Sequence, residues 1–266
     1  MPAEPKPLSQ NLVKKLKSLQ QKKNRDKEHG YIAEGIRLCE EALGSSRIHY
    51  GVITTDVLDS PRGKTLVGRL QKQNIPIYKA TASQFKNISD TKTPQGIALV
   101  IQKPPFSEPD PLTSPCLALD HIRDPGNLGT LLRSANWFGV KDIYVSTESV
   151  DPYNPKVVRS SMGSLFHCRI HENMELPSLL NTLGQKDYRC IGASTNGVDI
   201  RTVSSFEKDV IIIGSEAHGI SQHLSNYIDI EVAIPGSGKG ESLNAAIAGS
   251  IFLYHFTMRK KHDGQQ

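Results

Sequence analysis

The second half of the chain alternates between short apolar runs and longer stretches with helical spacing. Five nearly continuous apolar runs predict strands, at 116–120, 142–146, 189–194, 210–214 and 228–234. Helical patterns lie between or after them, at 127–138, 157–164, 176–183 and 242–258. Strands without a polar face, alternating with helices, are typical of a mostly parallel sheet covered on both sides. We therefore predict an α/β fold for this half.

The first half predicts a smaller α/β domain. Leu12, Leu16 and Leu19 share one helical face, and 31–43 reads as a second helix. A βαβ pattern follows, with strands predicted at 48–54 and 75–80 and a helix at 64–72 between them. A further strand is predicted at 96–102.

A proline-rich stretch separates the two halves. Residues 103–115, KPPFSEPDPLTSP, hold five of the 16 prolines, and such a segment sustains neither a helix nor a central strand. We therefore expect an N-terminal domain over 1–103, a linker over 104–115 and a C-terminal domain over 116–266.

Charge is concentrated in the first half, where 1–113 carries 18 Lys and Arg against 11 Asp and Glu. Such a basic cluster attracts polyanions, of which nucleic acid is the commonest, although a solvated helix face explains it equally well. Arg159, further along, has the same two interpretations, a phosphate contact or plain surface polarity. The candidate nucleic-acid contacts in the cluster are Lys14, Lys15, Lys22, Lys23 and Arg25.

The apolar runs and the cysteines argue against several further classes of protein. No apolar run approaches the roughly 18 residues that span a bilayer, so we expect no membrane association and a cytoplasmic location. The four cysteines form no CxxC pair, which argues against a disulfide scaffold or a zinc ribbon.

Three loops rich in glycine and polar residues follow predicted strands, where ligands bind in parallel sheets. They read DHIRDPGNLGT (120–130), GSEAHGIS (214–221) and IPGSGKGESLN (234–244). The third loop is not a P-loop, because Lys239 precedes Gly240 and no hydroxyl follows. The chain also lacks GxGxxG after the first strand, HExxH and GxSxG, which argues against nicotinamide enzymes, metalloproteases and serine hydrolases.

Taken together, the loops resemble the three motifs of the SpoU (TrmH) branch of the SPOUT superfamily of RNA methyltransferases. The matching segments are LDHIRDPGNLGTLLRSANWFGV, VIIIGSEAHGIS and VAIPGSGKGESLNAAIAGSIF, and NPKVVRSSMGSLFH resembles the segment between the first two. Residues 12–43 resemble a substrate-binding domain similar to ribosomal protein L30e. The resemblance implies 2′-O-ribose methylation of RNA with S-adenosyl-L-methionine as cofactor and no metal. It also implies a deep trefoil knot in the C-terminal domain and a homodimer whose active site involves the partner subunit.

The same resemblance implies the site residues. Arg133, Asn127, Glu216 and Asn244 would be catalytic, and Thr195, Gly214, Ile234, Ser242 and Leu243 would bind the cofactor. Two roles stay open for Arg133, as base or as stabiliser of phosphate and developing charge, since a guanidinium is a poor base. A surface arginine paired with Asp120 or Asp124 is the structural alternative, and helix capping is the alternative for Glu216 and Asn244.

Two departures from the family pattern are Ala217, where a second glycine is common, and Gly240, where valine is common. Neither affects Arg133 or Asn127. The two-domain arrangement resembles large-subunit rRNA enzymes and their antibiotic-resistance relatives, so 23S-type rRNA is the expected substrate. A tRNA 2′-O-methyltransferase, a base methyltransferase and a non-catalytic RNA-binding or ribosome-assembly protein that kept the fold are the alternatives.

Overall fold

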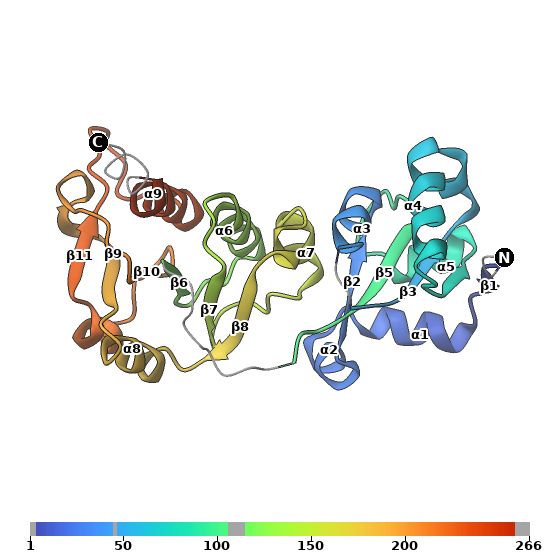
Figure 1. Ribbon diagram of the computed structural model, residues 1–266, viewed down its shortest axis with the longest axis horizontal. Helices are drawn as coiled ribbons and strands as arrows, with labels where there is room; N and C mark the ends of the chain where they lie inside the picture. The colour runs from blue at the N-terminus through green and yellow to red at the C-terminus, as the bar shows by residue number, and fades with distance from the viewer. Residues whose placement is uncertain (1–3, 45–46, 106–114, 259–266) are drawn as a thin grey trace. The chain divides into compact units, whose positions relative to one another are not determined.

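The computed structural model describes residues 4–44, 47–105 and 115–258. Most of the predicted linker, 104–115, lies outside these residues. The chain forms two compact units (Figure 1). The first runs to Pro105 and also includes Tyr153–Phe166, and the second comprises the rest. Helix α7 (Pro155–Ser160) and the 3₁₀ turn Ser164–Phe166 thus pack with the first unit, although the chain reaches them only after two strands of the second.

The first unit is built on a five-stranded sheet of described residues in the order β1-β4-β3-β5-β2. Its strands are β1 (Lys6–Pro7), β2 (Gly30–Glu34), β3 (Ile48–Ile53), β4 (Ile77–Lys79) and β5 (Ile97–Gln102). Its helices are α1 (Gln10–Ser18), α2 (Lys22–Glu28), α3 (Ile36–Ala42), α4 (Pro61–Lys72) and α5 (Ala82–Ile88), with a 3₁₀ turn at Thr55–Asp59. Strands β3 and β4 are parallel around α4, which confirms the predicted βαβ pattern.

One helix prediction in this unit is wrong. Residues 31–43 were expected as one helix, but Gly30–Glu34 forms β2, antiparallel to β5, and only Ile36–Ala42 is helical. Gly35 separates the two elements with a φ of 101°, a conformation that glycine adopts without strain. The pairing partner of β2 lies more than 60 residues away, so local periodicity could not reveal it.

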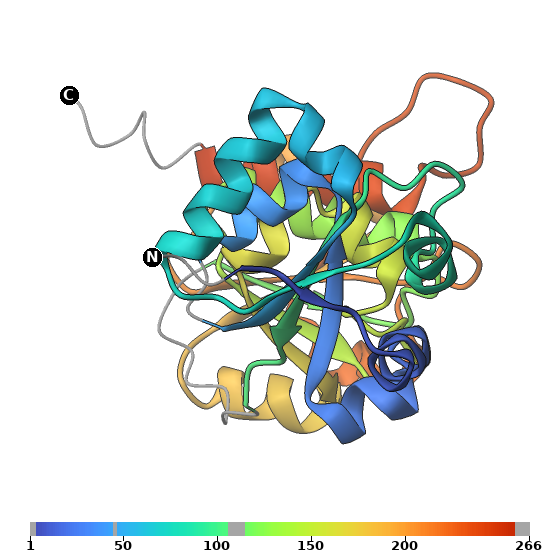
Figure 2. The same cartoon turned by 90° about the vertical axis from the view of Figure 1, so that its right-hand side faces the viewer.

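Helices cover both faces of the first sheet (Figure 2). On one face, Leu16 of α1, Leu19 just after it, and Phe85 and Ile88 of α5 join a cluster that also contains Val100 of β5. On the other face lie α3 and α4. The helical face predicted from Leu12, Leu16 and Leu19 is therefore the inward face of α1, with Leu12 partly buried.

The second unit contains a six-stranded sheet of described residues in which every neighbouring pair is parallel, in the order β11-β9-β10-β6-β7-β8. Its strands are β6 (Cys116–Leu119), β7 (Asp142–Ser146), β8 (Arg169–Met174), β9 (Arg189–Asp199), β10 (Asp209–Ile213) and β11 (Ile230–Ala233). Its helices are α6 (Pro125–Trp137), α8 (Leu176–Gly184) and α9 (Ala245–Met258), with 3₁₀ turns at Ile200–Thr202 and Gln222–Tyr227. The predicted α/β fold with a mostly parallel sheet is confirmed.

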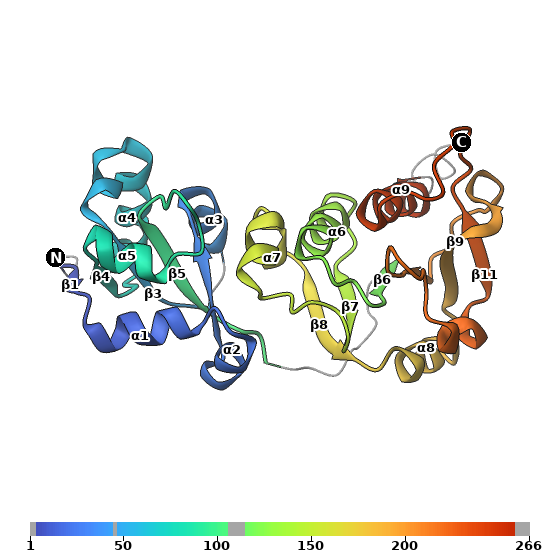
Figure 3. The ribbon, with the colours of Figure 1, turned by 180° about the vertical axis from the view of Figure 1, so that it is seen from behind.

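Alternate residues of the central strands face opposite helical layers. Cys116, Val210 and Ile212 pack in one cluster with leucines of α8. On the other face, Gly249 of α9 approaches Ile213 and Leu131 of α6 closely. Figures 1 and 3 show α6 and α9 on one side of this sheet and α8 on the other. Among the helices of the described ranges, none is long and apolar enough to cross a membrane.

Candidate active site

The carboxyl ends of β6 and β10 bring the first two motif loops together. These strands are adjacent and parallel, with Leu119 opposite Ile213. The amide of Asp120 continues the pairing by donating to the Ile213 carbonyl at 2.9 Å. Residues 120–127 and 214–221 therefore leave the sheet side by side, at the edge where the sequence predicted ligand binding.

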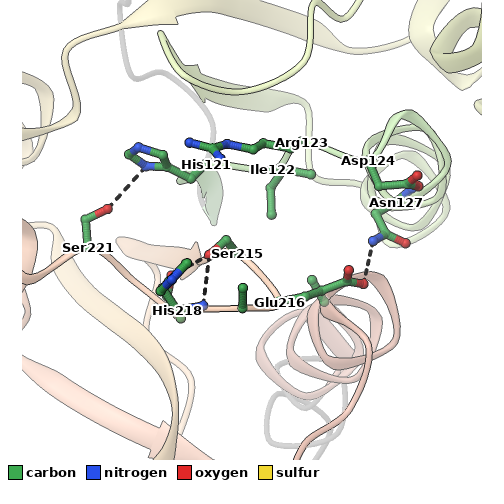
Figure 4. A pocket seen from close by; sticks show the side chains of 12 residues that line it. His121, Ile122, Arg123, Asp124, Asn127, Ser215, Glu216, His218 and Ser221 are labelled. Carbon is green, nitrogen blue, oxygen red and sulfur yellow. Dashed lines mark hydrogen bonds between the residues drawn. The ribbon is translucent and has the colours of Figure 1, made fainter.

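A cavity of about 370 Å³ lies between these two loops (Figure 4). One wall comes from the loop after β6 and the start of α6, and the other from the loop after β10. Its lining residues are His121, Ile122, Arg123, Asp124, Asn127, Ser215, Glu216, Ala217, His218, Gly219, Ser221 and Ala245. Sequence reasoning named Asn127 and Glu216 among them, but missed His121, Arg123 and His218, although all three stand inside the quoted motifs.

The second loop is held closed by its own backbone. Ser215 and Gly219 exchange two N–H···O hydrogen bonds of 2.9 Å, which leaves Glu216, Ala217 and His218 at the tip. The backbone of Gly219 packs against Gly214 so closely that a Cβ at Gly214 would lie 2.1 Å from the Gly219 carbonyl carbon. The positive φ of this turn falls on Gly219, at 66°, so the loop closes with alanine at Ala217.

The first loop is fixed to the second by the buried carboxylate of Asp120. Its Oδ2 accepts the Ser221 N–H at 2.8 Å, and its Oδ1 lies 2.7 Å from Nδ1 of His121. The same Nδ1 lies 3.2 Å from the Ser221 hydroxyl. Further along, the amide of His121 donates to Oγ of Ser146 at 3.0 Å. Both walls of the cavity are therefore preorganised by bonds within the protein.

Three of the four predicted catalytic residues form one hydrogen-bonded network. Oε1 of Glu216 accepts from Nδ2 of Asn127 at 2.6 Å and from Nδ2 of Asn244 at 2.5 Å. Asn244 also donates to Oδ1 of Asn127 at 3.1 Å. Its own Oδ1 caps α9 by accepting from Ala246 and Ile247, so the capping interpretation and the network hold together. Residues from all three motifs thus converge on one carboxylate.

Arg133 is not part of this network. It lies six residues after Asn127, which is about 1.7 helical turns, so it projects from a different side of α6. Its side chain is exposed and makes no hydrogen bond or ion pair with the residues that the structure describes. The expected alternative, a pair with Asp120 or Asp124, is not observed, because Asp120 bonds Ser221 and Asp124 caps α6 through the Asn127 amide.

The predicted cofactor residues lie around the ends of β9, β10 and β11. In β9 the pairing with β11 jumps from Gly192 to Val198, so the segment that contains Thr195 bulges out of the ladder. Gly214 follows β10 and Ile234 follows β11. Ser242 and Leu243 are exposed in the loop before α9, where 47% of the Leu243 surface is accessible. An apolar side chain beside glycine-rich backbone suits a flat, hydrogen-bonding base such as adenine.

The predicted RNA contacts differ in exposure and in the ion pairs they make. Lys14, Lys22 and Lys23 are exposed on α1 and α2. Lys15 pairs with Glu28 at 2.5 Å, and its ammonium group lowers the pKa of that carboxylate. Arg159 donates to Asp90 at 2.8 Å, within the first unit.

The prediction for Arg25 is wrong. This residue is 2% exposed, and its guanidinium donates to the carbonyls of Leu19 and Gln20, each at 2.8 Å. A helix leaves its last carbonyls without hydrogen-bond donors, and Arg25 supplies such donors to the carbonyls just beyond α1. It therefore stabilises the turn between α1 and α2 and is not a surface cation.

No group of three or more His, Cys, Asp or Glu residues that could hold a metal ion occurs in the part of the chain that the structure describes. The carboxylates in and beside the cavity make hydrogen bonds within the protein. Asp120 and Asp124 serve the loop and the helix cap, and Glu216 accepts from two amides.

Comparisons with known proteins give the class to which this site belongs. The model of the SpoU rRNA methylase family matches residues 114–254, and the model of the MRM3-like substrate-binding domain matches residues 10–99. The chain belongs to the SpoU rRNA methylase family, which confirms the resemblance inferred from the motifs.

Individual relatives agree over nearly the whole chain. The 23S rRNA (guanosine(2553)-2′-O)-methyltransferase RlmP of Bacillus subtilis is 32% identical, covering 91% of this chain and 94% of its own. A TrmH-family protein from Porphyromonas gingivalis has a similar solved structure, with 31% identity, a TM-score of 0.81 and coverage of 95% and 99%. An AdoMet-bound rRNA methyltransferase from Sinorhizobium meliloti is similar at 27% identity and a TM-score of 0.81, covering 97% of this chain and 98% of its own.

Proposed function

We propose that this protein transfers a methyl group from S-adenosylmethionine to a ribose 2′-hydroxyl of large-subunit ribosomal RNA. The observation that carries the proposal is the hydrogen-bonded network of Asn127, Glu216 and Asn244, whose first two members line the cavity, beside the loops that the family uses for the cofactor. The relative RlmP, which the chain matches over almost its full length, is named for this reaction on 23S rRNA. A tRNA substrate is less favoured for the same reason.

The residues proposed to bind the cofactor come from the bulge of β9, from the loops after β10 and β11, and from the loop before α9. S-adenosylmethionine, when bound, supplies an electrophilic methyl group. Thr195 in the β9 bulge, Gly214 and Ile234 would surround the adenosine with backbone groups, and Leu243 would cover the adenine face. Ser242 would contribute a hydroxyl. The AdoMet-bound relative from Sinorhizobium meliloti supports this choice of ligand.

Glu216 has the central part among the protein groups. Two amide donors hold its Oε1, so the carboxylate is fixed in direction before RNA arrives. Its other oxygen makes no hydrogen bond with the described residues and is available to the ribose hydroxyl. We assign Asn127 and Asn244 to positioning this carboxylate. The exposed guanidinium of Arg133 is assigned to a backbone phosphate and to the developing negative charge on the ribose oxygen.

A homodimer explains where Arg133 acts. It shares one face of α6 with Trp137, four residues on, whose side chain is 81% exposed. Helix α9 packs beside α6 and is apolar almost all round, yet it exposes Ile247 and Tyr254. A helix that is apolar on all sides is normally buried on all sides. We propose that a second copy covers this α6–α9 surface and receives Arg133 at its own active site.

Replacing Trp137 with glutamate is expected to convert the dimer to monomer, because a charge would have to be buried in the apolar interface. Size-exclusion chromatography with light scattering measures the mass. The fold should survive, since the side chain is exposed in the single chain. Trp137→Phe is the matched control and should stay dimeric. A Trp137→Glu variant that remains dimeric at low micromolar concentration would contradict this interface.

The first unit is proposed to bind RNA through the exposed lysines of α1 and α2. Replacing Lys14, Lys22 and Lys23 with glutamine should flatten the slope of log affinity against log salt by about 2, at roughly 0.7 per contact with single-stranded RNA. Fluorescence anisotropy with an rRNA fragment measures this slope. The control variant also loses three positive charges, at Lys64, Arg69 and Lys72 of α4, which covers the other face of the sheet. Equal slopes in both variants would contradict the proposed RNA face.

The function is tested by mapping 2′-O-methyl groups in total RNA from cells with and without the gene. Loss of the modification at one large-subunit rRNA nucleotide is the expected result. A difference confined to tRNA would contradict the proposed substrate, and a methylated base would contradict the chemistry. The non-catalytic alternative predicts no difference and no binding of S-adenosylmethionine by the purified protein. The trefoil knot and the cytoplasmic location inferred from the sequence stay predictions.

A further inference from the structure

We propose that Arg123 anchors the phosphate next to the target ribose in the cavity between the two motif loops, and that His218 forms the wall against the nucleobase. The proposal rests on the proposed function and names the substrate group that this cavity receives. It assigns roles to two side chains that neither the motif analysis nor the catalytic network uses.

Several polar side chains that line the cavity already take part in hydrogen bonds within the protein. His121 bonds Asp120 and Ser221, and Asp124 caps α6. Ser215 accepts the His218 amide at 3.2 Å, and Glu216 is held by two asparagines. These bonds shape the cavity, and among these residues Glu216 keeps its second carboxylate oxygen for the ribose hydroxyl.

Arg123 and His218 are different. Both are exposed, both line the cavity, and neither side chain makes a hydrogen bond or ion pair with the residues that the structure describes. Each nevertheless stands on rigid backbone. The residue before Arg123, Ile122, is held by Ser149 at 3.0 Å and by Val150 at 2.9 Å, and His218 sits at the tip of the closed Ser215–Gly219 turn. Polar side chains that the fold does not use, presented into a cavity on fixed backbone, are available for a ligand.

The chemistry and position of these side chains favour a nucleotide. A guanidinium matches the oxygens of a phosphodiester in charge and geometry, and an imidazole offers a flat face for stacking. Figure 4 shows Arg123 extending toward His121 and away from Asn127, whereas Glu216 points to Asn127. A ribose at Glu216 would therefore have room for its neighbouring phosphate toward Arg123. The volume of about 370 Å³ is within the range of small-ligand pockets.

The test compares full-length wild type, Arg123→Gln and Lys186→Gln in methylation of large-subunit rRNA from a strain lacking the gene. Lys186 is an exposed cation of the second unit, away from the cavity lining, and its replacement changes the net charge equally. Arg123→Gln should raise KM for rRNA about 10-fold or more, as expected for a lost charge-assisted hydrogen bond. Its affinity for S-adenosylmethionine, measured by calorimetry, should equal that of wild type.

Two further readouts separate a specific contact from a general loss of charge. Arg123→Lys should recover part of the affinity, and Arg123→Gln should flatten the salt dependence of RNA binding by about 0.7, one phosphate contact. His218→Phe should keep kcat/KM within about threefold of wild type, while His218→Ala lowers it by about fivefold or more. Equal KM values for Arg123→Gln and Lys186→Gln would overturn the proposal, and so would weakened cofactor binding in Arg123→Gln.

The wild-type arm distinguishes this proposal from the proposed function. If wild type transfers no methyl group to the rRNA, the proposed function fails. If wild type is active and Arg123→Gln behaves as Lys186→Gln does, only the role of Arg123 fails.

Discussion

Replacing Arg133 with alanine is expected to lower methyl transfer at least about 100-fold, the usual loss when a preorganised charge-stabilising donor is removed. Affinity for S-adenosylmethionine should be unchanged, because Arg133 lies outside the loops assigned to the cofactor. Thermal stability should change little, since the side chain is exposed and bonds no described residue. Single-turnover methylation, calorimetry and a melting curve measure these three quantities. Wild-type activity in the variant would remove Arg133 from the reaction.

A mixing experiment tests where Arg133 acts. Arg133→Ala and Glu216→Gln homodimers should each be nearly inactive. After subunit exchange, a mixed dimer contains one site with both residues intact if Arg133 serves the partner's Glu216. Activity should then return to about one quarter of wild type, because about half of the dimers are mixed and each has one active site. If both residues act within one chain, each mixed dimer has no intact site, and no activity returns. Mixing either variant with the double variant controls for exchange itself.

Replacing Leu243 with arginine is expected to abolish measurable binding of S-adenosylmethionine by calorimetry. The proposed contact is an apolar side chain against the adenine, and arginine would place a long cation in that space. Because Leu243 is 47% exposed, the substitution should not disturb the core, and the melting temperature should stay near that of wild type.

Leu243→Met is the matched control, because it keeps the apolar character and nearly the volume of leucine. It should bind the cofactor with affinity close to wild type. A Leu243→Arg variant that binds as well as Leu243→Met would show that the adenine does not lie on this residue, and the assignments of Ile234 and Thr195 would then need revision.

Several features of this protein were determined by sequence alone. The buried strands β6, β7 and β10 and the buried part of β9, residues 190–192, have few polar residues, so their apolar runs identify them without tertiary information. The motif loops were located for the same reason, since each begins where such a run ends. The family followed from the resemblance of those loops, in this order, to three known motifs, and the comparisons confirm it.

Other features depended on contacts between distant residues. Strand β8, RIHENM, is the last strand in the sheet order, and its four polar or charged residues leave no apolar run to detect. The sequence of β2 has a helical pattern, and only its pairing with β5 makes it a strand. Arg25 has the sequence character of a surface cation, and only the end of α1 gives its guanidinium two carbonyls to bind.

The candidate site likewise combines features that the sequence identified with features that only the tertiary structure decided. Sequence identified Asn127, Glu216 and Asn244 as candidates, but their shared network requires β6 and β10 to end at the same sheet edge and α9 to start beside them. The direction of Arg133 away from Asn127, in contrast, follows from helical spacing, because six residues make about 1.7 turns. Local periodicity reports whether a residue is buried and in which element. It does not report which distant group lies opposite, because that is decided by strand order and helix packing, which bring together residues that are up to 117 positions apart.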